Sequence, residues 1–93
     1  INMSKRAEAA NKIVNYLTSE LNKFNAPYGV LSSEIPIGRG KIRQVTFGIA
    51  RYLDATINIY SEKRFKIQGR GALASKYNGD FESVEQVIEH LSK

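Results

Sequence analysis

The sequence lacks cysteine altogether and contains one histidine, His90. The absence of cysteine excludes disulfides, thiolate metal sites and Cys-His nucleophiles. His90 falls beside the hydrophobic stripe of a predicted helix, where a lone histidine is expected to be solvated rather than catalytic. No spacing of acidic residues suggests a metal site. We therefore expect no enzyme and no cofactor.

Long hydrophobic runs are also missing, since none approaches the ~18 residues that a membrane span needs. We expect no membrane partner and a cytoplasmic protein. The 93 residues, of which 42% are hydrophobic, suffice for one compact core. The expected organisation is a single domain over residues 3–93, with Met3 as the native start and residues 1–2 as an expression remnant.

Positive charge is unevenly distributed along the chain. The formal net charge is +5, and residues 39–76 contain nine bases against two acids. Residues 1–38 are nearly neutral and residues 77–93 are acidic. Localised basic charge is typical of a polyanion-binding site. The alternative interpretation is a basic surface that only aids solubility.

Helical periodicity occurs over residues 4–24 and 81–92. In both segments hydrophobic residues recur at steps of three and four, which predicts one buried stripe per helix. Ser4 is placed to cap the first helix, and either Asp80 or Ser83 can cap the last. A single helical turn is also expected at 72–76.

Strand periodicity occurs over residues 42–68, where three short runs alternate between hydrophobic and polar residues. Their short links predict an antiparallel meander. Residues 25–41 contain two prolines and are interpreted as a connection, with short edge strands at most at 28–31 and 35–37. The predicted fold class is an α+β two-layer sandwich. Its order is α-β-β-β-α, with room for an extra edge strand and with both helices on one face.

The other sheet face is predicted to look outward. It would carry Gln44, Thr46, Tyr52, Thr56, Asn58, Tyr60, Arg64, Lys66 and Gln68. Nucleobases stack on aromatic rings, and cations contact phosphates, so this mixture suits a nucleic-acid platform. Strand propensity and cross-strand pairing are the alternative explanation for the tyrosines and threonines.

Gly-Arg-Gly occurs at 38–40 and again at 69–71, on either side of the strands. Glycine lets a backbone approach a phosphate, and a flanked arginine is free for bidentate contacts. The two copies are expected at opposite ends of the meander, ~20 Å apart, and cannot form one cradle. Ordinary strand-end glycines are the alternative. The predicted nucleic-acid-binding residues are Arg39, Lys41, Arg43, Tyr60, Lys63, Arg64, Lys66 and Arg70.

The order helix, three strands, helix resembles that of double-stranded RNA-binding domains in topology alone. That family places a lysine cluster at the start of its last helix, where this chain has Asp80-Phe81-Glu82-Ser83. No residue role is therefore carried over, and the aromatic motifs of RNA-recognition motifs are not found on the strands.

The leading hypothesis is a small non-catalytic nucleic-acid-binding protein that favours RNA over DNA. The second is a protein-interaction module or inhibitor that docks on an acidic partner surface. The high content of Asn, Ile, Lys and Tyr suits an AT-rich genome, and with it a phage accessory or counter-defence protein. A homodimer that pairs edge strands is a third alternative.

Overall fold

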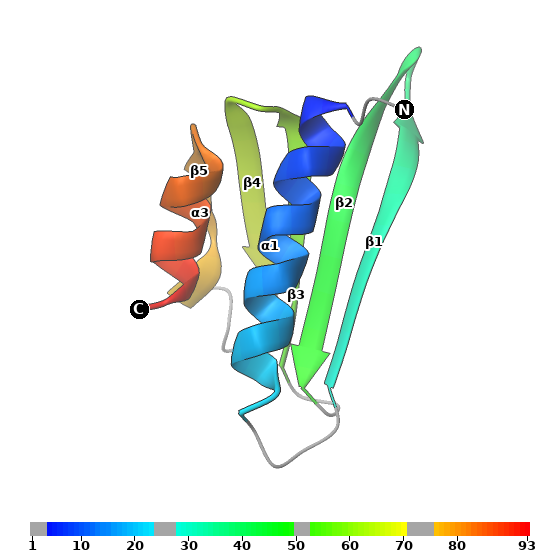
Figure 1. Ribbon diagram of the computed structural model, residues 1–93. Helices are drawn as coiled ribbons and strands as arrows, with labels where there is room; N and C mark the ends of the chain where they lie inside the picture. The colour runs from blue at the N-terminus through cyan, green and yellow to red at the C-terminus, as the bar shows by residue number, and fades with distance from the viewer. Residues whose placement is uncertain (1–3, 24–27, 50–52, 71–75) are drawn as a thin grey trace.

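The computed structural model describes residues 4–23, 28–49, 53–70 and 76–93 (Figure 1). Its elements in chain order are α1 (Lys5–Leu21), β1 (Tyr28–Ile37), β2 (Gly40–Ile49), β3 (Leu53–Ser61), β4 (Arg64–Gly69), β5 (Gly79–Phe81) and α3 (Val84–Leu91). All five strands form one antiparallel sheet in the order β1-β2-β3-β4-β5.

Serine side chains begin both helices, as their sequences predict. The Ser4 hydroxyl accepts a hydrogen bond from the Ala7 amide at 3.1 Å. Ser83 accepts from the Gln86 amide at 3.1 Å, while the Gln86 side chain accepts from the Glu82 amide at 2.9 Å. The bonds to the Ala7 and Gln86 amides satisfy donors that the first turn of a helix leaves without partners, and the bond to Glu82 fixes the residue before the second cap.

The prediction that the last helix begins at residue 81 is wrong. Asp80 and Phe81 belong to β5, in which Phe81 lies opposite Phe65 of β4. By pairing with the edge of β4, residues 79–81 gain hydrogen-bond partners for their backbone, and the Phe81 ring packs against the core. The helix therefore begins only at Val84, after the Ser83 cap.

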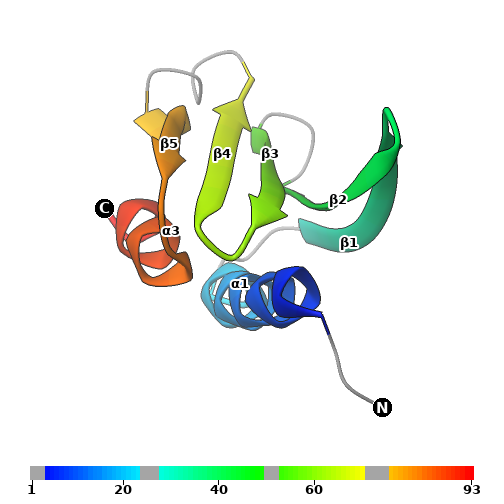
Figure 2. The same cartoon turned by 90° about the horizontal axis from the view of Figure 1, so that it is seen from above.

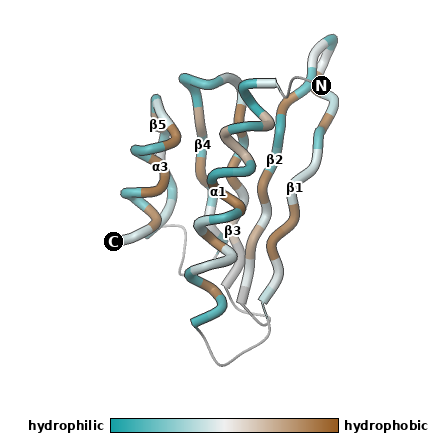
Figure 3. Tube along the Cα trace, in the orientation of Figure 1, coloured by the Kyte–Doolittle hydropathy of each residue, from teal (hydrophilic) through white to brown (hydrophobic). Residues whose placement is uncertain are grey.

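The core lies between the sheet and the helices. Val45, Ile57 and Ile67 follow one another across β2, β3 and β4, and all three are fully buried. Ile13 of α1 and Val87 of α3 belong to the same cluster. Hydropathy alternates along α1 and the strands, as one-sided burial requires (Figure 3).

The prediction that residues 25–41 form a connection is wrong for most of that segment. Residues 28–37 form the ten-residue strand β1, which pairs with β2 along its whole length. Gly38 and Arg39 are the hairpin turn, and Gly38 adopts φ = 56°. Pro36 fits because β1 lies at the sheet edge, where a missing amide proton need not cost a ladder bond.

Both helices lie on the same face of the sheet (Figure 2), which confirms the predicted α+β two-layer fold. Within the described ranges, no helix or strand covers the opposite, outward face, and the β1–β2 hairpin bends away from the helices. Neither described helix has the length and apolar character needed to cross a membrane.

Some sequence predictions lie outside the described residues. They concern residues 1–3, Phe24, Arg51, Tyr52 and residues 71–75, which include most of the helical turn expected at 72–76. Lys76 and Tyr77, which follow, are helical.

Candidate functional site

The antiparallel register brings bases from several segments to one end of the sheet. The turns at 38–39 and 62–63 both lie at this end, and α1 begins there (Figure 1). We call this set the basic end: Lys5, Arg6, Arg39, Lys41, Arg43, Lys63 and Arg64. Six of the eight residues predicted from sequence lie in or beside it, the sixth being Tyr60 near the end of β3.

Acidic residues offset the basic end only in part. Glu8 lies 3.9 Å from Lys5, and Glu34 lies 3.7 Å from Arg6. Glu62, in the second turn, is the third acid on these segments. The acids of β5 and α3 lie on the flank beyond β4. Positive charge is therefore in excess over the first four strands.

Three of the bases lie exposed in or next to the turns: Arg39, Lys41 and Lys63. None of them forms an ion pair with another described residue. Their charges are available to an external anion, since no internal carboxylate neutralises them.

The predicted residues divide between the two sheet faces. Arg64 and Lys66 alternate with the buried Phe65 and Ile67, so they lie on the outward face, as predicted. Arg43 lies opposite Glu34 and, two residues before buried Val45, on the helix-covered face. Lys41 lies two residues before Arg43, so the same alternation places it on the helix-covered face as well. The basic end therefore wraps around the end of the sheet.

Tyr60 is half-buried, and its ring is contacted by Arg64. The guanidinium carbon lies 4.8 Å from the ring centroid, a cation–π contact. A register shift between Ile59 and Ser61 accompanies this contact. The open tyrosine platform predicted from sequence is thus a Tyr60–Arg64 pair.

The centre of the outward face is polar. The Gln44 side-chain amide donates to the Asn58 side-chain oxygen at 2.9 Å across β2 and β3. Lys66 of β4 continues this row of side chains across the sheet, since it is paired with Asn58 of β3 on one side and with Asp80 of β5 on the other. Thr56 and Gln68 form part of the neighbouring row.

Arg70 lies at the opposite end of the sheet, after the last residue of β4. The two Gly-Arg-Gly copies are therefore at opposite ends, as predicted, although Gly71 is outside the described residues. Arg70 is exposed and takes part in interactions of its own. It does not extend the basic end.

At the C-terminal end of α1, the positive charge of Lys23 is neutralised by a neighbouring carboxylate. Lys23 lies 2.7 Å from Glu20, and this hydrogen-bonded pair lowers the pKa of Glu20 and raises that of Lys23. Burial, followed by the nearby Glu20 charge, raises the pKa of Tyr16. Lys23 is therefore already paired, in contrast to the turn residues of the basic end.

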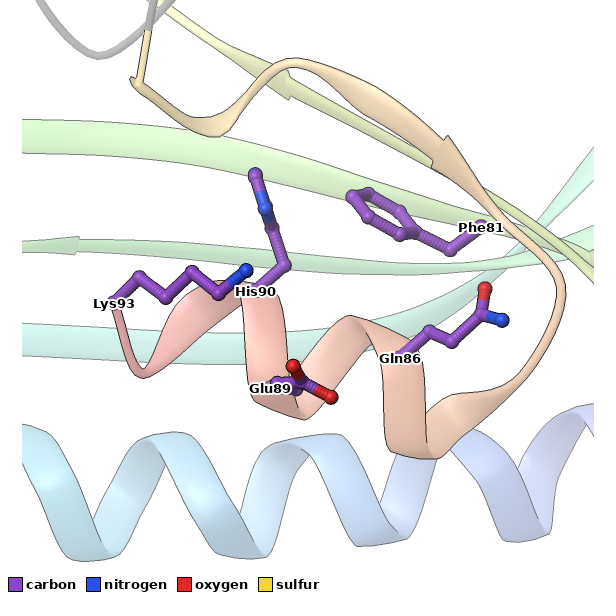
Figure 4. Close-up of a pocket in the computed structure, with 5 residues that line it drawn as sticks. All are labelled: Phe81, Gln86, Glu89, His90 and Lys93. Carbon is purple, nitrogen blue, oxygen red and sulfur yellow. The ribbon is translucent and has the colours of Figure 1, made fainter.

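A shallow depression lies beside α3, where His90 and Phe81 point towards each other with ring centroids 4.7 Å apart (Figure 4). Two of its polar side chains already have protein partners. His90 Nε2 lies 3.2 Å from the Tyr77 carbonyl oxygen, and Gln86 accepts from Glu82. The histidine that the sequence placed in solvent is half-buried and helps attach α3 to β5.

Among the described residues, no group of three His, Asp or Glu side chains is placed to hold a metal ion. Comparison with protein-family models, with curated proteins and with solved structures found no match to this chain. The geometry of the basic end is therefore the main evidence on function.

Sequence reasoning missed the contribution of Lys5 and Arg6. They were not among the predicted binding residues, because no local pattern relates them to the turns. The β1–β2 hairpin did leave a signal, because Gly38 provides a turn residue directly before the alternating residues of β2.

Proposed function

We propose that this chain is a small non-catalytic nucleic-acid-binding protein that favours RNA over DNA. The basic end carries the proposal, because bases distant in sequence lie at one end of the sheet and outnumber the acids on the same segments. Such a cluster neutralises phosphates, and the released counterions favour binding. The proposed setting is the cytoplasm, where a chain without cysteine has no disulfide to lose.

The two turns suit a single bound strand. They lie at the same end of the sheet, so Arg39 and Lys63 can contact phosphates along one strand. Lys66 continues the positive charge onto the outward face. Phosphate contacts would thus start at the turns and extend over the sheet.

The outward face supports RNA in particular. Its amides and hydroxyls, such as Gln44, Asn58 and Thr56, can hydrogen-bond base edges and the 2′-hydroxyl that only RNA carries. The Tyr60–Arg64 pair provides a flat surface on which an unpaired base can stack.

Fluorescence anisotropy would test this proposal with labelled single-stranded and duplex RNA and DNA at two salt concentrations. A variant that combines Arg39→Gln, Lys41→Gln and Lys63→Gln should lose about tenfold or more in affinity at low salt. For this variant the slope of log affinity against log salt concentration should be less steep by about 2. Each phosphate contact on a single strand contributes about 0.7 to that slope, and three contacts are lost.

The matched control combines Lys12→Gln, Lys76→Gln and Lys93→Gln, which gives the same net charge with the basic end intact. It should keep most of the affinity. If no nucleic acid binds at low salt, or if the control loses as much as the test variant, the proposal fails.

A protein-interaction module is the second candidate, favoured by two exposed aliphatic side chains on β1. Leu31 is 66% exposed and Ile37 is 49% exposed. The partner would present an acidic surface with apolar side chains. A stoichiometric complex that survives nuclease treatment, without binding to any of the four nucleic acids, would favour this candidate over the first.

A further inference from the structure

The two edges of the sheet differ in how they are protected. The β5 edge is only three residues long, and α3 packs beside it. The β1 edge is ten residues long and pairs on one side only, with β2, within the described part of the chain. A long open edge is a template for another strand.

The β1 edge also has few of the features that prevent strand addition. It contains no lysine or arginine, and its only charge, Glu34, is turned to the helix side and paired with Arg6 at 3.7 Å. Pro36 is the one blocking residue, and it lies near the turn. Leu31, at 66% exposure, leaves an apolar side chain beside the open edge.

We propose that β1 pairs with β1 of a second copy of this chain in a two-fold antiparallel arrangement. The proposal goes beyond nucleic-acid binding and does not depend on it. The result would be a continuous ten-stranded sheet with no long open edge. Closed two-fold pairing uses the same surface on both copies, so the edge must be complementary to itself.

The register supports such self-complementarity. Ile37 and Gly40 flank a two-residue turn. In such hairpins the flanking residues form a hydrogen-bonded pair, so the alternation of an antiparallel ladder makes the odd-numbered residues of β1 the ones that bond to β2. The even-numbered residues then direct their amides and carbonyls to the open edge. Pairing centred on Ser33 lets those even residues form about six main-chain hydrogen bonds between copies.

The same register joins the apolar side chains. Ser33 would lie opposite Ser33 of the second copy, and Leu31 opposite Ile35 of the second copy. All of these side chains lie on the outward face. Cross-strand aliphatic pairs stabilise a sheet, and here they would cover Leu31.

Charge selects the antiparallel direction. A parallel pair would place two basic ends side by side, and like charges would repel. The antiparallel pair puts the basic ends at opposite ends of the joint sheet, each beside the Tyr28 end of the other strand. A single strand pair buries less than a standard interface, so the dimer should depend on concentration.

Sedimentation velocity from low micromolar to submillimolar concentration, after nuclease treatment, tests the proposal. A dimer should appear as concentration rises. Leu31→Lys should weaken it by about tenfold or more, which corresponds to about 1.4 kcal/mol. The matched control is Gln68→Lys, an exposed position in the same row of the outward face but on β4. It should leave the dimer unchanged, and circular dichroism should show both variants folded.

A cysteine scan tests the register itself, because the chain has no cysteine of its own. Opposed residues in a pair without main-chain hydrogen bonds have Cα atoms about 4.5 Å apart, within the range of a disulfide. Oxidised Ser33→Cys should therefore form covalent dimers in high yield, and Gln68→Cys should not. A monomer at all concentrations overturns the proposal. So does a dimer that nuclease removes, that Leu31→Lys leaves intact, or that cross-links equally at both cysteines.

Discussion

Gly38 is the residue on which the β1–β2 hairpin turns. Its φ of 56° lies in the left-handed region, which residues with a Cβ atom rarely adopt. This turn places Arg39 at the basic end and keeps β1 paired with β2. One glycine therefore supports both the candidate site and the open edge.

Gly38→Ala should lower the free energy of unfolding by about 1–2 kcal/mol, the usual cost of a left-handed residue with a Cβ. The cause is backbone strain, since a Cβ at this position would meet no atom within 4 Å. Urea unfolding would measure the loss. Gly40→Ala is the control because Gly40 has no positive φ and its Cβ would meet its nearest atom only at 3.9 Å. Equal losses in both variants would contradict the strain argument.

Arg43 shows what a single position in the sequence can and cannot predict. Its charge marked it as a candidate phosphate contact, and it does lie at the basic end. The strand register determines which face of the sheet Arg43 lies on: it is paired with Glu34, and both lie on the helix-covered face. Charge is a property of the residue, whereas its direction depends on the strand around it.

At the scale of elements, α3 depends on its cap and on its contacts with the sheet. With eight residues it is too short to be stable alone in water. The Ser83 hydroxyl accepts from the Gln86 amide, and His90 contacts Phe81 and the Tyr77 carbonyl. The cap fixes where the helix begins, and the contacts attach it to β5.

Ser83→Ala should destabilise the protein by about 0.5–2 kcal/mol, because the Gln86 amide loses its acceptor. Ser83→Asp should retain most of the stability, since aspartate also caps helices well and its charge suits the helix dipole. Thermal or urea unfolding of both variants would measure the difference. If alanine proves as stable as aspartate, Ser83 does not act as the cap.

The five strands differ in how well alternation and turn residues in the sequence predicted them. Alternation in residues 42–68 predicted β2, β3 and β4 correctly, because each buries one face. Residues 28–37 lack this alternation, since Val30 and Leu31 are adjacent, and Pro36 argued against a central strand but is compatible with the edge strand β1. β5 has three residues and no period of its own, so only the existing edge of β4 makes it a strand.

At the scale of the whole molecule, one core joins every element. Phe65 is 1% exposed and is the largest fully buried side chain among the described residues, and it belongs to the cluster that α1, α3 and the sheet share. A domain with a single core is expected to unfold in one transition. Its total stability should lie in the usual range of about 5–15 kcal/mol.

Phe65→Ala should remove about 3–5 kcal/mol through lost burial and a cavity. That is a large share of the total, so the urea midpoint should fall steeply in a single transition. Leu31→Ala is the control, because a side chain that is 66% exposed contributes little in the monomer. It should change stability by no more than about 0.5 kcal/mol at low protein concentration. Similar effects of the two substitutions would contradict the assignment of the core.

Periodicity and composition alone predicted the α+β class, the Ser4 cap of the first helix, the meander and an excess of positive charge in the central part of the chain. These depend on local periodicity and composition, which short segments carry in full. The fold was needed to show that Lys5 and Arg6 lie at the same end as the two turns, and that β1 pairs with β2 alone among the described residues. The reason is that both depend on which strands are neighbours and on where α1 begins along them, relations between segments that no single segment contains.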